Sequence, residues 1–129
     1  MIENLIQNLI AISLGTMLFF SFVIAPVIFK VLDAKNAGKF VRKIFPHYYL
    51  INLVILSIAV FLLVCISSVN LDFYITLTIA ILFSFSLFIL MPLINKFKDS
   101  KKEKKFKYSH NLSVIINFIQ IIGLVYLVF

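Results

Sequence analysis

The chain has 129 residues, of which 63% are hydrophobic and 13% are charged, and its formal net charge is +7. Soluble domains are about half apolar, so this composition excludes a soluble globular enzyme or binding domain. The basic residues adjoin long apolar stretches and lack interleaved stacking aromatics, which excludes nucleic acid as a partner.

Four uncharged stretches follow one another along the chain, and each is long enough to cross a bilayer. A hydrocarbon core of roughly 30 Å needs about 20 helical residues at a rise of 1.5 Å per residue. The alternating segments of about ten residues that are typical of membrane β-barrels are absent. We therefore predict an all-α, four-helix transmembrane bundle that forms a single membrane domain over residues 1–129. Its spans are expected at about 5–31, 47–68, 72–95 and 107–128.

The connection after the first span predicts a short amphipathic interfacial helix over residues 34–45. Its apolar and basic side chains fall on opposite faces at helical spacing. The apolar face consists of Ala37, Phe40, Val41, Ile44 and Phe45, and the basic face of Lys35, Lys39, Arg42 and Lys43. We expect this helix to lie along the membrane surface and to end at Pro46, where the second span begins.

All 12 basic residues lie in the first and third connections between spans, and the second connection and both termini have none. Short basic loops are retained in the cytoplasm, so the positive-inside rule predicts that both termini lie outside, an N-out/C-out topology. The strong preference for lysine over arginine is typical of AT-rich bacterial genomes. We therefore expect a multi-pass protein of the bacterial inner membrane.

The basic connections are also candidate binding sites for anionic lipid headgroups. A basic side chain close to a negatively charged leaflet gains about 1 kcal/mol. The candidate headgroup ligands are Lys35, Lys39, Arg42, Lys43, Lys101, Lys102, Lys104 and Lys105. The alternative is that these side chains only fix the orientation of the spans.

The two halves of the chain resemble each other around their prolines. Segments 26–40 and 92–106 share a proline, an isoleucine, an aspartate, a phenylalanine and three lysines at one offset of 66 residues. Two helices per half preserve orientation, so the pattern predicts a parallel repeat about an axis along the membrane normal. The hypothesis is a 2+2 pseudo-symmetric bundle.

Polar residues inside the spans indicate which helix faces point into the bundle, because hydrocarbon disfavours them. Two of the spans contribute most of them. The second span contributes His47, Tyr48, Tyr49 and Asn52, and the fourth contributes a narrow stripe of His110, Ser113, Asn117 and Gln120. One interpretation is hydrogen bonding between packed helices. The other is a polar, ligand-binding cleft open to the cytoplasm, with the two histidines at its mouth.

His47 and His110 both begin spans that return from the basic side, at similar depth. Two facing imidazoles can ligate haem iron or a transition metal, although no cluster supplies a third ligand. The expectation is no cofactor, with haem or metal binding as the alternative. Because no carboxylate lies within a span and no nucleophile or phosphate-loop motif occurs, we expect a non-enzymatic protein.

Several motifs occur in a fixed order along most of the chain. They are the Phe-rich first span ending in Ala-Pro, the Phe-Pro-x-Tyr-Tyr turn, and the His-x-x-Ser-x-x-x-Asn stripe. In these motifs the chain resembles the four-span proteins grouped with vertebrate transmembrane protein 205. The resemblance implies signature positions at Gly15, Pro26, Gly38, Phe45, Pro46, Tyr49, His110, Ser113 and Asn117. It implies the architecture above and no particular activity.

Three functional hypotheses follow from these observations. The leading one is a transport, helper or assembly subunit that acts through a cleft formed by spans one, two and four. Four helices enclose little volume, so this hypothesis expects a homo-oligomer or a larger membrane partner. The second is a haem- or metal-binding protein that uses His47 and His110, and the third is a protein that binds anionic lipids through its basic connections.

Overall fold

A computed structural model describes all 129 residues, and every regular element in it is helical. In chain order the elements are α1 (Ile2–Phe19), the π-helical turn η1 (Phe20–Ile24), α2 (Ala25–Val31), α3 (Ala34–Cys65), α4 (Leu71–Phe85), the π-helical turn η2 (Ser86–Leu90), α5 (Met91–Asp99) and α6 (Glu103–Val128). The π turns continue their helices, so the chain forms four rods. The rods are Ile2–Val31, Ala34–Cys65, Leu71–Asp99 and Glu103–Val128, each long and apolar enough to cross a membrane. The predicted all-α fold with four spans is confirmed.

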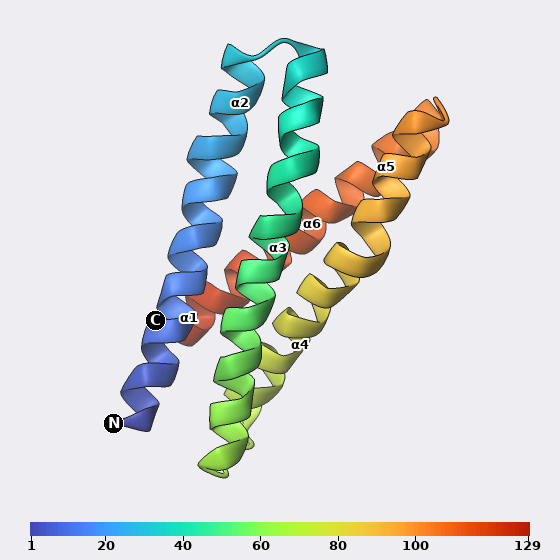
Figure 1. Cartoon of the computed structure of the whole chain (residues 1–129). Coiled ribbons are helices and arrows are strands. Elements are labelled where there is room, and N and C mark those ends of the chain that lie inside the picture. The colour runs from blue at the N-terminus through green and yellow to red at the C-terminus, as the bar shows by residue number, and fades with distance from the viewer.

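The rods run alternately up and down and pack as a ring (Figure 1). α1 contacts α3 and α6, and α4 contacts the same two helices, which closes the ring. Each rod contributes a fully buried side chain to the core, namely Met17, Leu56, Phe83 and Leu124. The outer surface is formed largely by exposed leucine, isoleucine, valine and phenylalanine side chains. An apolar exterior around satisfied backbone hydrogen bonds is what a hydrocarbon solvent requires.

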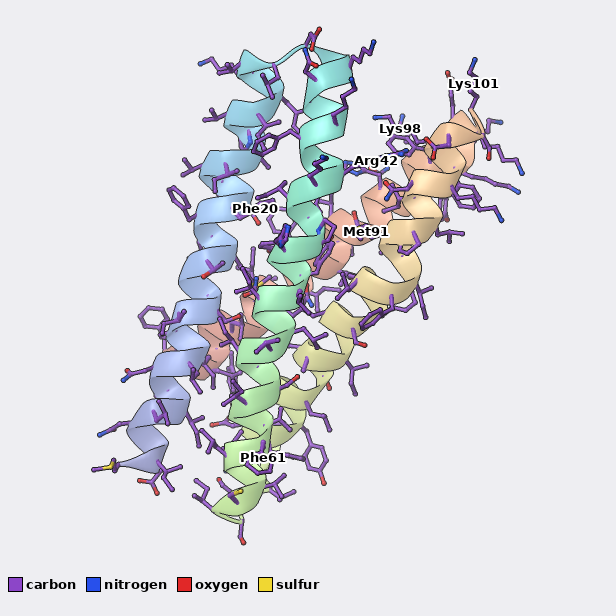
Figure 2. All side chains as sticks on the ribbon, in the orientation of Figure 1. Phe20, Arg42, Phe61, Met91, Lys98 and Lys101 are labelled. Carbon is purple, nitrogen blue, oxygen red and sulfur yellow. The ribbon has the colours of Figure 1, made fainter.

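The two ends of the bundle carry opposite charge. Gln7 Nε2 donates a hydrogen bond to the carbonyl of Leu127 at 3.1 Å, so the start of α1 and the end of α6 lie at the same end of the bundle. Glu3 and Asp72 surround a small recess at this end, which we call the acidic end. The turns after α2 and after α5 lie at the other end, the basic end, where Lys101 projects from the tip (Figure 2).

Side-chain caps define where two of the rods begin. The Asp33 carboxylate accepts a hydrogen bond from the backbone N–H of Asn36 at the start of α3. Asn70 Oδ1 accepts one from the N–H of Phe73 at the start of α4. Such caps satisfy N–H groups that have no partner within the helix. They locate the first residues of α3 and α4 directly after the first and second connections.

The segment 34–45 does not form the separate interfacial helix expected from its amphipathic pattern. α3 continues through Pro46 without interruption, although the proline removes one backbone N–H from the helix. Part of the apolar face of this segment packs inside the protein, although Phe40 on the same face is exposed. Ala37 is only 1% exposed, and the ring of Phe45 lies 5.2 Å from the ring of Phe20. The segment is therefore the basic end of the second rod.

Both π turns lie directly before a proline. η1 ends two residues before Pro26, and η2 ends two residues before Pro92. The missing proline N–H leaves a carbonyl one turn earlier without its helical donor, and a widened turn accommodates the ring. The two π turns are separated by the same 66 residues that relate the sequence segments. This recurrence supports the 2+2 repeat.

Candidate functional site

The ring of rods opens at the basic end. There α2 packs on α3 and α5 packs on α6, whereas the two pairs make few contacts with each other. Figure 1 shows α5 leaning away from α2 and α3. A cavity of about 520 Å³ occupies this space. Its size falls within the roughly 300–1,000 Å³ of typical small-molecule sites.

The cavity lies between the two halves of the chain, and all four rods contribute to its lining. Positions that correspond at the offset of 66 residues both occur in the lining, including Ala25 with Met91 and Tyr48 with Val114. Aromatic rings dominate the walls, which contain Phe20, Phe22, Phe29, Phe45, Phe106 and Phe118. In Figure 2, Phe20 and Met91 lie on either side of α3. Transporters commonly bind their substrates at such a repeat interface.

Three hydrogen-bonded polar side chains form part of the lining, and we call them the polar floor. The Tyr48 hydroxyl donates to Asn117 Oδ1 at 2.7 Å, and Asn117 Nδ2 donates to Ser21 Oγ at 2.8 Å. The three residues come from α3, α6 and η1, so the floor joins three rods. Because the amide of Asn117 is bonded at both ends, the floor is held in one arrangement.

A second polar group continues from the floor into the packed core. Ser13 Oγ donates to Asn52 Oδ1 at 2.7 Å, and Asn52 Nδ2 donates to the carbonyl of Tyr48 at 2.9 Å. Ser13 and Asn52 are completely buried and do not line the cavity. Hydrogen bonding between packed helices is therefore the interpretation that applies to Asn52.

The mouth of the cavity is cationic. The Arg42 guanidinium pairs with the Asp99 carboxylate and also donates to the carbonyl of Asn95 at 3.3 Å. This is the only ion pair in the structure, so the ammonium group of Lys98 has no carboxylate partner. Lys98 Nζ instead lies 5.6 Å from the ring centroid of Phe106. Figure 2 shows Arg42 and Lys98 together in the gap between α3 and α5.

The two histidines do not meet. His110 lines the cavity, where its ring stacks on Phe106 with centroids 6.0 Å apart. His47 is exposed and lies outside the cavity, so the predicted pair of histidines at one mouth is not observed. The reason is helical geometry. His47 is two residues from both Phe45 and Tyr49, which line the cavity, and two residues turn a helix by more than half a revolution, so His47 lies on the opposite side of α3.

A family described as a domain of unknown function (DUF4149) matches residues 8–103. The chain belongs to the DUF4149 family. A relative from Aquifex aeolicus (strain VF5), described as an uncharacterized protein, is 34% identical over 115 residues, which cover 89% of this chain and 85% of the relative. No solved structure matches the chain. The DUF4149 match includes both π turns and the cationic mouth, whereas most of α6 lies beyond it.

The predicted cleft residues of this DUF4149 protein divide into two groups. The residues that line the cavity are Tyr48, Tyr49, His110, Ser113 and Asn117, and those that do not are His47, Asn52 and Gln120. Gln120 is completely buried, and its Nε2 donates to the carbonyl of Ile79 at 3.2 Å. Ser113 Oγ donates back to the carbonyl of His110, one turn earlier in its own helix.

Sequence reasoning missed the wall that α5 contributes. Met91, Ile94, Asn95 and Lys98 line the cavity from one face of this helix. Their spacing of three and four residues is the helical pattern that indicates a shared face, so the signal was present in the sequence. It was obscured because Lys98 belongs to a lysine-rich run that reads as a solvated connection.

The candidate headgroup ligands and the signature positions of the DUF4149 chain lie partly on the surface and partly around the cavity. The candidate headgroup lysines are exposed at the basic end, namely Lys35, Lys39, Lys43, Lys101, Lys102, Lys104 and Lys105. Arg42 differs because Asp99 pairs with it. Of the signature positions, Gly38 and Phe45 line the cavity, Pro26 follows η1, and Pro46 lies within α3. Gly15 faces outward, with no atom within 4 Å of the position of a Cβ.

Proposed function

We propose that this multi-pass membrane protein is a non-enzymatic subunit that binds one amphipathic small molecule in the cavity between its halves. The observation that carries the proposal is a cavity of about 520 Å³ with aromatic walls, a fixed polar floor and a cationic mouth. Binding sites of this kind combine a mostly apolar lining with a few oriented polar groups. The role that follows is transport of the molecule, or its presentation to a larger membrane assembly.

The chemistry of the lining supports binding over catalysis. Tyr48, Asn117 and Ser21 are already bonded to one another, so they orient a ligand without being free to exchange protons with it. We also propose that binding needs no haem or metal ion, because His110 faces the cavity and His47 faces away from it.

The setting of the protein is part of the same proposal. The positive-inside rule supports placing the basic end on the cytoplasmic side of a bacterial inner membrane, with both termini outside. The order of motifs supports kinship with the proteins grouped with transmembrane protein 205. A cavity that opens at one end gives no path across the bilayer, so transport requires a second copy or a larger membrane partner.

Native mass spectrometry of the detergent-purified protein tests the proposal, with monoolein as an uncharged amphipathic probe. We expect a saturable complex of one monoolein per chain. Ala25→Trp fills the cavity and is expected to abolish the complex, whereas Ala11→Trp, on the exposed face of α1, is expected to preserve it. Non-saturable binding, or binding by Ala25→Trp equal to that of the unaltered protein, would overturn the proposal. Thermal melts of both variants establish that each is folded.

A further inference from the structure

We propose that the cavity selects single-chain amphiphiles with an anionic headgroup, and that the ammonium group of Lys98 is the headgroup ligand. The inference rests on the proposed function, because it assumes that an amphiphile occupies the cavity. It differs from attraction of bulk lipid to the exposed lysines, since it concerns one side chain in the lining.

The mouth of the cavity holds one cation without a counter-charge. Two cationic side chains line the cavity, Arg42 and Lys98. Asp99 neutralises Arg42, which leaves Lys98 as the cation without a counter-charge. Lys98 is exposed at this mouth, where an anionic group can reach it, and charge-assisted hydrogen bonds are among the strongest that proteins form. A carboxylate or phosphate headgroup supplies the missing anion.

Gly38 leaves space for the end of the Lys98 side chain. A Cβ at Gly38 would lie 3.0 Å from Lys98 Nζ, closer than ordinary van der Waals contact. On its other side the ammonium group faces the ring of Phe106 at 5.6 Å, a distance at which a cation is attracted to an aromatic ring. Gly38 leaves room for the end of the Lys98 side chain and the ring of Phe106 attracts its ammonium group, so Nζ lies near residues of both α3 and α6.

The charged and apolar residues follow one another along the cavity. Along the third rod the lining runs from Lys98 to Leu90, a rise of roughly 12 Å at 1.5 Å per residue. The cation therefore lies at one end of an apolar channel. Phe22 and Phe118 border this channel, and both are about half exposed on the outer surface. With its headgroup at Lys98, the acyl chain of the ligand lies along the aromatic wall in the direction of Leu90. Phe22 and Phe118 border this path where it meets the outer surface of the bundle.

The test compares three probes that share one oleoyl chain, namely oleate, oleoyl lysophosphatidate and monoolein. Dissociation constants are measured by native mass spectrometry of the purified chain. Pairing with an ammonium group adds a charge-assisted hydrogen bond to the headgroup, so we expect the two anions to bind roughly tenfold tighter than monoolein. Lys98→Gln is expected to remove this preference while monoolein binding persists. Lys96→Gln, on the same helix but outside the lining, is expected to retain it.

Two further measurements separate the alternatives. Gly38→Ala keeps the charge but displaces the ammonium group, so it is expected to weaken oleate binding and to leave monoolein binding unchanged. Inorganic phosphate at millimolar concentration is expected not to displace oleate. If phosphate competes fully, the site takes a free anion and the inference falls. Equal binding of oleate and monoolein also overturns it while leaving the proposed function intact, whereas failure of all three probes removes the proposed function itself.

Discussion

Asn117 and Gln120 lie one turn apart on α6, yet their side chains have opposite hydrogen-bonding environments. The Asn117 amide is bonded at both ends, to Tyr48 and Ser21 on two other rods. Gln120 is completely buried, and its Oε1 atom has no partner. An unpaired buried polar group costs about 1–3 kcal/mol. The Asn117 amide is thus paired at both ends, whereas the Gln120 amide, whose Nε2 donates to the carbonyl of Ile79, is paired at one end only.

Substituting these residues tests the difference. We expect Asn117→Leu to destabilise the protein by about 1–2 kcal/mol, because two inter-helix bonds of about 0.6 kcal/mol each are lost and Tyr48 loses its acceptor. Gln120→Leu is expected to be neutral or stabilising, since it removes an unsatisfied atom. Asn111→Leu, at an exposed position of α6, is the control. Reversible unfolding in mixed micelles measures all three, and a larger loss for Gln120→Leu would contradict the prediction.

The sequence predicted the inward face of α6 correctly but not where the bundle opens along it. Spacing alone places Asn117 and Gln120 on one face, because the helical period is local. Which of them meets a cavity depends on the separation of α5 from α3, which no local pattern encodes. His47 was misplaced for a related reason, since similar depth in the membrane does not imply a similar direction around the helix.

At the scale of the elements, the three prolines of this chain have different consequences. Pro46 lies inside the continuous helix α3, whereas Pro26 and Pro92 each follow a π turn. The residues of η1 and η2 border the cavity, with Phe20 to Phe22 on one side and Leu90 on the other. The π turns thus lie where the rods change from a closed ring to separate pairs, and sharp changes of helix direction commonly occur at such turns.

Replacing Pro92 with alanine tests this account of the π turns. The new N–H restores a donor to the helical ladder, so we expect η2 to tighten to regular α-helix and its amides to exchange more slowly with deuterium. Hydrogen exchange followed by mass spectrometry measures peptides that cover residues 86–95. Pro26→Ala is expected to have the same effect on η1. Unchanged exchange in both segments would show that the prolines do not cause the π turns.

Hydropathy predicted the four rods because long apolar stretches have one stable form in lipid. The interfacial helix was not predictable in the same way. An amphipathic pattern requires an apolar partner for one face but does not say whether that partner is lipid or protein. For residues 34–45 the partner is in part protein, as the burial of Ala37 and the packing of Phe45 near Phe20 show, whereas Phe40 on the same face is exposed.

At the scale of the whole molecule, the dominant feature is the separation of charge between the two ends. Glu3 and Asp72 lie at the acidic end, and the lysine-rich turns lie at the other. Moving a cluster of lysines across a membrane is unfavourable, so the positive-inside rule predicts that the basic end stays in the cytoplasm. The open end of the cavity is also the basic end, which makes the orientation decisive for the compartment from which a ligand enters.

Cysteine labelling in cells tests this orientation. Cys65→Ser removes the only cysteine and provides an unlabelled background. In that background we expect Ser68→Cys, in the turn after α3, to react with a membrane-impermeant maleimide on intact spheroplasts. Lys102→Cys, in the turn after α5, is expected to react only after permeabilisation. Labelling of Lys102→Cys from outside would invert the topology and assign the cavity to the opposite compartment.

A cavity between two identical halves would bind a ligand in two equivalent poses. The two halves of this chain differ where they line the cavity, because the position that is Phe29 in one half is Asn95 in the other, and Ala25 corresponds to Met91. One wall is thus aromatic where its counterpart offers an amide. A molecule bound between the halves, as proposed, would therefore meet two unlike walls and prefer one of the two poses.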